Sequence, residues 1–374
     1  MRRVLVRVDF NVPLTDGQVA DDFRIQAALP TVRALLERKV GITLISHLGR
    51  PAGRPHGAFS LQPLAEVVSR HLGQPVTFVP GVPGDSTYRQ AVSADPGAVL
   101  LAENLRFDPG EETNDPDFAI RLAFGHDGFV QDAFGTLHRA HASTVAITRL
   151  LPACAGPLVA AEVRALDLLL SDPRRPFGLA VGGAKMKDKL PLLRRLLPEV
   201  NTVFLGGALA NTFLAASGLA VGSSLYEPAE LDSAAALLES WPEVIHLPDT
   251  VVVEAAGQVD EVAVTEVSAD ARIMDVGERT LQAWRPIVLG LGRLFWNGPM
   301  GLYERPPFDH GTATLARTIG EMTGMSVVGG GDSLAAIRRL GLEGAVSHLS
   351  TGGGASLTYL EGEILPGLQA LEER

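Results

Sequence analysis

MSVVGGGDSLAAIRRLG, residues 325–341, carries the pattern that decides the fold of this chain. A short apolar run leads into a glycine turn, and the LAAIRRLG that follows has the spacing of an amphipathic helix. The same unit recurs along the sequence. Strands that alternate with helices predict parallel sheets with helices on both faces, and the recurrence in two halves predicts two domains of the α/β class.

Further strands and helices follow from the same pattern. The predicted strands are residues 4–10, 41–48, 98–107 and 127–134 in the first half, and 177–183, 202–208, 244–253, 293–299, 325–331 and 345–353 in the second. The clearest helices are 24–39, 61–72, 231–241 and 334–341. A break at residues 150–157, followed by one Ala/Leu-rich helix, places the boundary between the halves in a helix at 155–171.

The composition excludes several classes of function. The chain has 374 residues, 46% hydrophobic and 20% charged, with a net charge of −11, which argues against general affinity for nucleic acid or an anionic membrane. A single cysteine, Cys154, rules out an intrachain disulfide. No apolar stretch is long enough to span a membrane, and the apolar N-terminal run is broken by Arg7 and Asp9, unlike a signal peptide. We therefore expect a cytoplasmic protein.

Cations and polar groups gather where the predicted strands of the first half end. These residues are Asp9, Asn11, Arg24, His47, Arg50, Arg106, His138, Arg139 and His141. Ligands of open parallel sheets bind beyond the carboxyl ends of the strands, and arginine forks hold phosphate and carboxylate groups. The cluster predicts a pocket for a small substrate with several negative charges. A metal site at His138 and His141 is a weaker alternative, because no cysteine or HExxH pattern accompanies them.

The second half has four glycine-rich turns, in AVGGAKMKDK, FLGGALANTF, VVGGGDSLAA and LSTGGGASLTYL. Glycine lets backbone amides approach phosphate oxygens, especially at a helix N-terminus. The chain has only four lysines, and Lys185, Lys187 and Lys189 follow the first of these turns. The sequence has no Walker A motif, because no lysine follows a glycine. Asp332 is either a helix N-cap or a carboxylate for Mg²⁺ beside nucleotide phosphates.

With these segments assembled, the sequence resembles the phosphoglycerate kinase family over nearly its whole length. The matching segments are VRVDFNVPL, SHLGRP, ENLRF, DAFGTLHRAHAST, GGAKMKDKL, WNGPMGLYE, GGGDS and SHLSTGGGASLTYLEG, in the family's order. The chain departs from the family at Gln131, where Asn is usual, and in GGALANTF, which replaces a GGGMA-like turn at Ala208.

The resemblance implies two Rossmann-like three-layer domains joined by a hinge helix across a central cleft. Residues 1–154, with the C-terminal tail 360–374 packed back on them, would bind phosphoglycerate; 155–171 would be the interdomain helix, and 172–359 would bind the nucleotide. Asp9, Asn11, Arg24, His47, Arg50, Arg106 and Arg139 would hold the phosphoglycerate. Gly183, Lys185, Lys189, Gly207, Asn297, Glu304, Gly330, Gly331, Asp332 and Ser333 would serve the nucleotide, with Asp332 on Mg²⁺.

The implied reaction is reversible transfer of a phosphoryl group from 1,3-bisphosphoglycerate to MgADP, in glycolysis, gluconeogenesis or carbon fixation. Arg24, Lys185, Gly353 and Gly354 would stabilise the moving group, and no general base is needed because the acceptor is a carboxylate. We expect a monomer that binds small molecules only. Two alternatives remain from the residues: a kinase for another acyl phosphate, and a nucleotide-binding regulatory protein with an inactive site.

Overall fold

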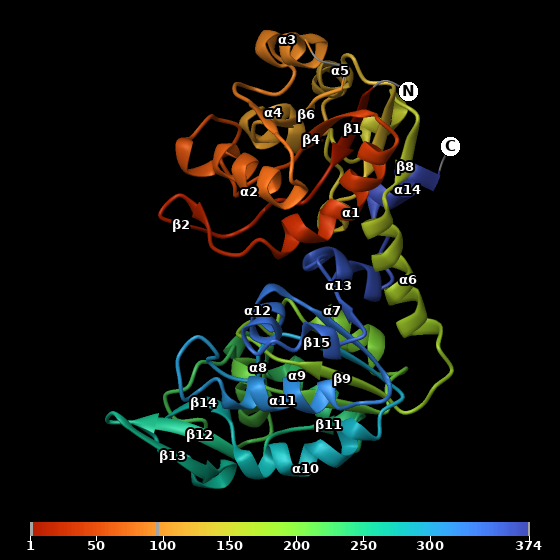
Figure 1. Cartoon of the computed structure of the whole chain (residues 1–374). Helices are drawn as coiled ribbons and strands as arrows, with labels where there is room; N and C mark the ends of the chain where they lie inside the picture. Colours follow the sequence, from red (N-terminus) through yellow and green to blue (C-terminus); the bar gives the residue numbers. More distant parts are fainter. Residues whose placement is uncertain (1–2, 95–96, 373–374) are drawn as a thin grey trace. The chain divides into compact units, whose positions relative to one another are not determined.

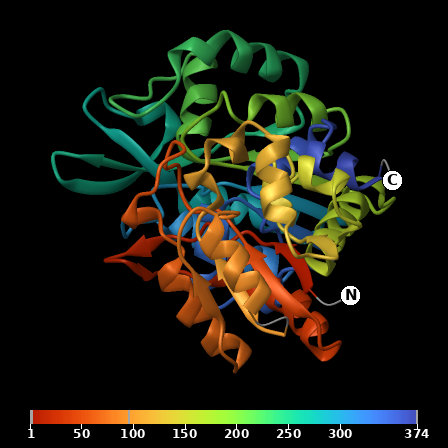
Figure 2. The same cartoon turned by 90° about the horizontal axis from the view of Figure 1, so that it is seen from above.

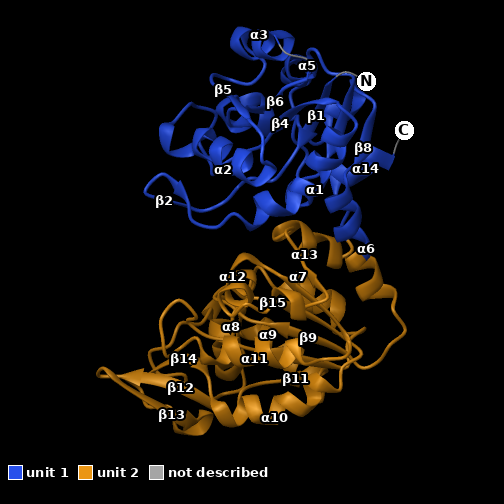
Figure 3. Cartoon of the chain, viewed as in Figure 1, with its two compact units in different colours: residues 1–164, 363–374 blue, residues 165–362 orange. Residues whose placement is uncertain are grey.

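The computed structural model describes residues 3–94 and 97–372 of the chain. The chain divides into two compact units: unit 1 comprises residues 1–164 and 363–374, and unit 2 comprises residues 165–362 (Figure 3). Residues 1–2, 95–96 and 373–374, which fall within the expected N-terminal domain and its tail, lie outside the described residues.

Unit 1 is built on a six-stranded sheet in the order β5-β6-β4-β1-β7-β8, in which every pair of neighbours is parallel. The strands are β1 (Arg3–Arg7), β4 (Gly41–Ile45), β5 (Thr77–Val79), β6 (Val99–Ala102), β7 (Gly128–Gln131) and β8 (Ala153–Ala155). A small hairpin of β2 (Leu14–Thr15) and β3 (Gln18–Val19) follows β1. Asp16 and Gly17 at its turn have φ of 51° and 75°, which suits a two-residue Asp-Gly connection.

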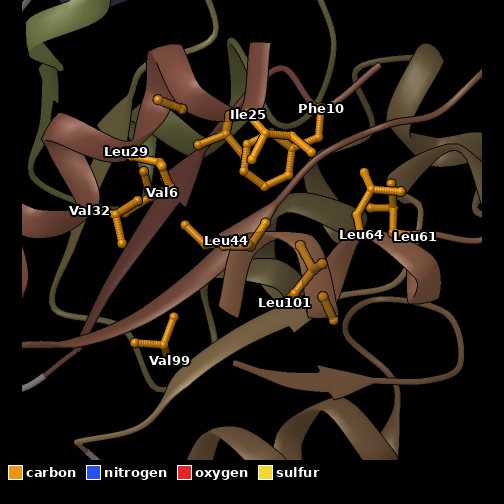
Figure 4. Packing of buried hydrophobic residues seen from close by; sticks show 14 of the residues in the cluster. Val6, Phe10, Ile25, Leu29, Val32, Leu44, Leu61, Leu64, Val99 and Leu101 are labelled. Atoms are coloured by element: carbon orange, nitrogen blue, oxygen red, sulfur yellow. The ribbon is translucent and has the colours of Figure 1, made fainter. Parts of the chain in front are cut away.

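Alternate side chains of a strand point to opposite faces of the sheet. Because β1 is buried throughout, both faces of this sheet are covered by helices. Val4 and Val6 of β1 join a core with α1 (Phe23–Glu37) and α2 (Gln62–Leu72). In Figure 4, Leu29 and Val32 of α1 lie beside Val6, and Leu64 of α2 lies beside Leu61. Leu5 joins the opposite core, with α3 (Ser86–Ala94) and α5 (Pro116–Ala123). Unit 1 is therefore a three-layer α/β/α unit.

Unit 2 has a second six-stranded parallel sheet in the order β11-β10-β9-β15-β16-β17. Its strands are β9 (Phe177–Val181), β10 (Thr202–Leu205), β11 (Ile245–His246), β15 (Arg293–Asn297), β16 (Met325–Gly329) and β17 (His348–Leu349). Every residue of β9 and β15 is buried, so both faces are covered. The α/β class with mostly parallel sheets is confirmed.

The remaining helices connect these strands. They are α4 (Pro109–Glu112), α7 (Leu190–Leu196), α8 (Gly207–Ala216), α9 (Leu231–Ser240), α10 (Glu278–Leu289), α11 (His310–Gly320), α12 (Gly331–Arg339) and α13 (Gly354–Leu360). The boundary between the two units falls inside α6 (Pro157–Ser171), after Arg164. The last helix, α14 (Pro366–Glu372), belongs to unit 1, where the Gly367 amide donates to the carbonyl oxygen of Leu137 at 3.0 Å.

The prediction of one strand over 244–253 is wrong. Pro248 and Asp249 interrupt the run, so β11 ends at His246 and β12 (Thr250–Ala255) begins a separate antiparallel sheet with β13 (Gln258–Ala263) and β14 (Arg272–Val276). The β12–β13 hairpin projects from the rest of unit 2 in both views of the cartoon (Figures 1 and 2). The expected strand over 98–107 is also too long: it ends at Ala102, and Leu105–Phe107 form a 3₁₀ turn.

Candidate functional site

The carboxyl ends of the unit 1 strands bring the predicted anion-binding residues together. Asp9 follows β1, His47 follows β4, and Arg106 lies in the turn after β6. The β1, β4 and β6 strands are neighbours in the sheet, so their ends share one edge. Asp9, His47 and Arg106 are each only about 6% exposed, which places these charged and polar groups inside the fold rather than on its surface.

Hydrogen bonds fix the loops that carry these groups. Arg24 Nη1 donates to Asp9 Oδ2 at 2.9 Å, and its guanidinium also reaches the carbonyl of Asn11 at 3.4 Å. Asn11 Oδ1 accepts from the Gly49 amide at 2.9 Å, and Arg106 Nη1 donates to the Gly49 carbonyl at 2.7 Å. The three loops are therefore tied to one another, and the charged ends of Arg24 and Arg106 are held in place.

Burial, and after it the neighbouring positive charges, lower the pKa values of the histidines in this cluster. Burial, then Arg7 and Arg106, lowers the pKa of His47 well below its usual range. Burial, then Arg106 and Arg7, lowers the pKa of His141 to about 3. The exposed Arg50 and Arg139 both act electrostatically on Arg106, so they belong to the same cluster in unit 1. Such a concentration of cations on an acidic protein is suited to a small polyanion.

Sequence reasoning missed a buried network beneath this cluster. Arg7, 1% exposed, donates from Nε to Ser143 Oγ at 2.9 Å, and its Nη2 lies 3.1 Å from His47 Nδ1. Ser143 in turn donates from Oγ to the fully buried Glu111 Oε1 at 2.6 Å. The available signal was Arg7 at the end of the apolar run of residues 4–6, which the sequence pattern marks only as a break in that run.

Unit 2 contains a mostly apolar cavity of about 310 Å³ that is suited to a planar base and its sugar. The predicted Gly183, Gly207 and Glu304 line it. Other residues of its wall were not predicted: Asn211, Leu225, Val251, Met274, Asp275 and Met300. Burial raises the pKa of the Asp275 carboxyl to about 7, although the amides of Gly311 and Val276 donate to it.

A second, more polar cavity of about 390 Å³ shares Gly183, Ala184, Pro299 and Asp332 with the first. Its wall contains Lys185, Lys189, Asn297, Gly330, Gly331, Gly353 and Gly354, all of them predicted site residues. The Lys189 Nζ donates to Asn297 Oδ1, whereas the exposed Lys185 forms no hydrogen bond or ion pair within residues 3–94 and 97–372. Burial lowers the pKa of Lys189, while Asp188 and Asp332 oppose this shift.

Two of the four glycine turns serve a purpose that the sequence did not predict. The Gly183 amide donates to the Pro299 carbonyl at 2.9 Å, and the Gly207 amide to the Met300 carbonyl at 2.7 Å. A Cβ on Gly207 would lie 2.9 Å from the backbone of Gly183. These glycines let neighbouring loops pack backbone against backbone, and their own amides are already paired within unit 2.

The other two turns keep their amides available. The first helical hydrogen bond of α12 runs from Leu334 N to Gly330 O, so the amides of residues 331–333 precede it. In the turn before α13, the amides of Gly353 and Gly354 likewise donate to no acceptor in the described part of the chain. The Ser333 hydroxyl does not line either cavity; it accepts from the Gly298 amide at 2.7 Å and fixes that loop.

Asp332 fits the carboxylate that Mg²⁺ requires beside phosphates. Asp332 is exposed and lines both cavities, and it accepts a hydrogen bond from the Tyr303 hydroxyl at 3.5 Å. Mg²⁺ is usually bound by one or two carboxylates, with waters and phosphate oxygens as its other ligands. No group of three or more His, Cys, Asp or Glu residues that could hold a metal occurs in the described ranges.

The fold is of the α/β class, with an anion cluster in unit 1 and two adjoining cavities in unit 2. The model of the family described as phosphoglycerate kinase matches residues 1–363. The chain therefore belongs to the phosphoglycerate kinase family and is a kinase of glycolysis.

Curated relatives and solved structures agree with this assignment. The phosphoglycerate kinases of Thermomicrobium roseum and Thermus thermophilus are both 48% identical, over 100% and 99% of this chain and 97% of their own lengths. The structure of phosphoglycerate kinase from Coxiella burnetii has a TM-score of 0.85 at 39% identity, covering 100% of this chain and 96% of its own. The crystal structure of phosphoglycerate kinase from Pyrococcus horikoshii has a TM-score of 0.90 at 30% identity. The match covers 99% of this chain and 96% of that one. In the described residues no helix is both long and apolar enough to cross a membrane.

Proposed function

We propose that the chain transfers a phosphoryl group reversibly between 1,3-bisphosphoglycerate and ADP, giving 3-phosphoglycerate and ATP. The family membership supports the reaction type. The observation that carries the choice of substrate is the anion cluster of unit 1, in which buried Arg106 and half-buried Arg24 are tied to the Asn11 and Gly49 loops. A single-charge substrate such as acetate would not need so many cations.

In the direction that consumes ATP, a carboxylate oxygen of 3-phosphoglycerate attacks the γ-phosphorus. The bond from that phosphorus to the bridging oxygen of ADP breaks, and the acyl phosphate forms. The attacking carboxylate is already ionised at neutral pH, so no residue has to remove a proton. The work of the protein is to align the reactants and to neutralise charge on the moving group.

Each residue then has a role in this proposal. Asp9, Asn11, His47, Arg50, Arg106, Arg139 and His141 position phosphoglycerate, while Arg24 and Lys185 stabilise the transferring group with the amides of Gly353 and Gly354. Lys189, Asn297, Gly330, Gly331 and the backbone amide of Ser333 position the phosphates, and Glu304 contacts the ribose. The walls formed by Gly183 and Gly207 hold the base. Asp332 would hold Mg²⁺, which supplies charge neutralisation at the phosphates.

Because these two binding sites belong to different units, we infer that turnover requires the phosphoglycerate-binding unit 1 and the nucleotide-binding unit 2 to approach each other around α6. Solution scattering should then show compaction when both substrates are bound, compared with either alone. We also propose, from the family resemblance, a cytoplasmic monomer. Light scattering that gives a larger mass than 39.6 kDa would contradict the monomer.

The reaction is tested by measuring ADP formation from MgATP that depends on 3-phosphoglycerate, with the acyl phosphate removed as it forms. We expect turnover with 3-phosphoglycerate and none with acetate. Turnover with acetate or another simple carboxylate would redirect the proposal to a different acyl phosphate. Nucleotide binding without any turnover would point to a regulatory protein with an inactive site.

A further inference from the structure

The buried Arg7 contacts His47, one of the residues of the anion cluster. Arg7 is the last residue of β1, and His47 follows β4, the neighbouring parallel strand. Nη2 of Arg7 lies 3.1 Å from Nδ1 of His47, with both residues buried. This is hydrogen-bonding distance between nitrogens of two side chains that have little contact with solvent.

Only one arrangement of protons satisfies this contact. A guanidinium has five N–H donors and no acceptor, and it does not lose its proton in proteins. His47 Nδ1 must therefore accept, and the proton of the neutral imidazole lies on Nε2. A doubly protonated imidazole would place an N–H against the N–H of Arg7, so the contact also opposes protonation. Rotating the ring by half a turn would leave the buried Nη2 facing carbon.

The guanidinium of Arg7 is held toward His47 by hydrogen bonds from its Nε and Nη1. Nε donates to Ser143 Oγ at 2.9 Å, and Nη1 donates to the Val8 carbonyl at 2.7 Å. Ser143 links this charge to Glu111, which accepts from the serine Oγ at 2.6 Å and from its amide at 3.0 Å. Arg7 and the buried Glu111 carboxylate thus neutralise each other through one hydroxyl group.

We propose that Arg7 is a positioning residue that fixes His47 as the neutral Nε2–H tautomer, so that His47 offers a single hydrogen-bond donor to the anionic substrate. Nε2 has no hydrogen-bond partner among residues 3–94 and 97–372, so it is available to a ligand. The charged groups that act on His47 are Arg7 from β1, Arg24 from α1 and Arg106 beyond β6, with His141 as a further titratable neighbour. All of them disfavour a second proton on the ring. The part of the proposal that concerns substrate rests on the proposed function.

The tautomer can be read directly by two-bond ¹H–¹⁵N NMR of the full chain labelled at histidine nitrogen, with His47 assigned from the spectrum of His47→Gln. We expect an acceptor-type signal from Nδ1 and an N–H signal from Nε2, unchanged from about pH 5.5 to about pH 8. A protonated Nδ1 anywhere in that range overturns the proposal. This readout is independent of activity, so it stands even if 3-phosphoglycerate proves not to be the substrate.

Arg7→Met removes the donor, and we expect a mixture of tautomers and a higher pKa for His47. If the proposed function is also correct, KM for 3-phosphoglycerate rises about tenfold while KM for MgATP is unchanged. Arg3→Met is the matched control: Arg3 is another buried arginine of β1, and it donates to Thr43 and the carbonyls of Ile42 and Ala98. It should leave the His47 signals unchanged.

A milder variant covers the case in which Arg7→Met does not fold. Ser143→Ala keeps Arg7 but removes the acceptor of its Nε, so the guanidinium is held less firmly against His47. The His47 signals should then broaden, or shift part of the way toward those of a mixture of tautomers. If Arg7→Met folds and the His47 signals remain those of the wild type, Arg7 does not set the tautomer. If Arg7→Met does not fold, unchanged signals in Ser143→Ala lead to the same conclusion.

Discussion

Lys189 donates a hydrogen bond from Nζ to Oδ1 of Asn297, across the wall of the polar cavity in unit 2. The neighbouring Lys185 lines the same cavity and has no such partner within the described residues. One ammonium group is therefore fixed and the other is free to move. A chain that otherwise uses arginine for nearly all its cations keeps lysine at both positions, although only Lys185 has the freedom to follow a moving phosphoryl group.

Lys185→Ala should lower kcat by about 10² to 10³, because one charge that stabilises the transferring group is lost. Lys185→Arg should restore little of this, since a planar guanidinium is directional whereas an ammonium is a compact point charge. Lys187→Ala is the control, because Lys187 lines neither cavity and should be silent. Near-full turnover of Lys185→Arg, measured in steady state, would contradict the role we give to lysine here.

Gly182→Ala should destabilise unit 2 by several kcal/mol. A Cβ at this position would lie 2.0 Å from the Pro299 carbonyl oxygen, and the Gly182 amide already donates to Asn297 O at 3.0 Å. The two loops would have to separate, and overpacking of this kind costs about 1–3 kcal/mol or more. Urea unfolding gives the measurement. Gly344→Ala, where a Cβ meets open space, should change stability little.

The stability of the chain should fall between about pH 4 and pH 7 because of Asp275. Burial raises its folded pKa to about 7, above the unfolded value of about 3.9. Between these two pKa values the folded state holds a proton that the unfolded state has lost. The contribution of Asp275 to the free energy of unfolding is therefore full below about pH 4, and it disappears as the pH rises through the folded pKa. The loss amounts to about 4 kcal/mol at most.

The contribution of Asp275 is isolated by comparing the free energy of unfolding at about pH 5 and about pH 8 in wild type and Asp275→Asn. The wild type should lose more stability across this range than the variant does. Asp270→Asn, at an exposed position, should behave as the wild type. Equal losses in wild type and Asp275→Asn would show that this carboxyl titrates normally.

Asp132→Ala should lower the free energy of unfolding by about 2–4 kcal/mol, because this one carboxyl group accepts hydrogen bonds from both α1 and α6. Asp132 Oδ1 accepts from the amides of Leu158 and Val159 at the start of α6, and Oδ2 accepts from the Thr31 hydroxyl of α1. Thr31→Val removes only one of these donors, so it should cost about 1 kcal/mol. Similar costs for the two variants in urea unfolding would mean that the helix amides find other partners.

The sequence predicted the architecture well because parallel strands buried on both faces have near-continuous apolar runs. It also predicted where the polar residues of the sites gather, since the carboxyl ends of such strands meet at one edge. The antiparallel sheet was missed. Its strand β13, QVDEVA, is largely exposed and acidic, and its partner β12 adjoins β11 in one apolar run.

What the sequence could not predict are contacts between distant segments. Arg7 and Ser143 are separated by 136 positions, and nothing near either residue indicates the other. The wall of the apolar cavity was not predicted either, because it brings together residues far apart in the sequence, such as Asn211 of α8 and Asp275 of β14. The close packing of the Gly183 and Gly207 loops was not predicted, because a glycine that admits a ligand and one that admits a neighbouring loop have the same sequence pattern.

The placement of α14 in unit 1 has a consequence for the order in which the chain is built. Unit 2 is a continuous segment, residues 165–362, so all of its strands have been translated before the last twelve residues are made. Unit 1 begins first but needs Gly367 against Leu137, a contact between a segment that follows unit 2 in the sequence and one that precedes it. On the ribosome, the unit translated first is therefore the one that is finished last.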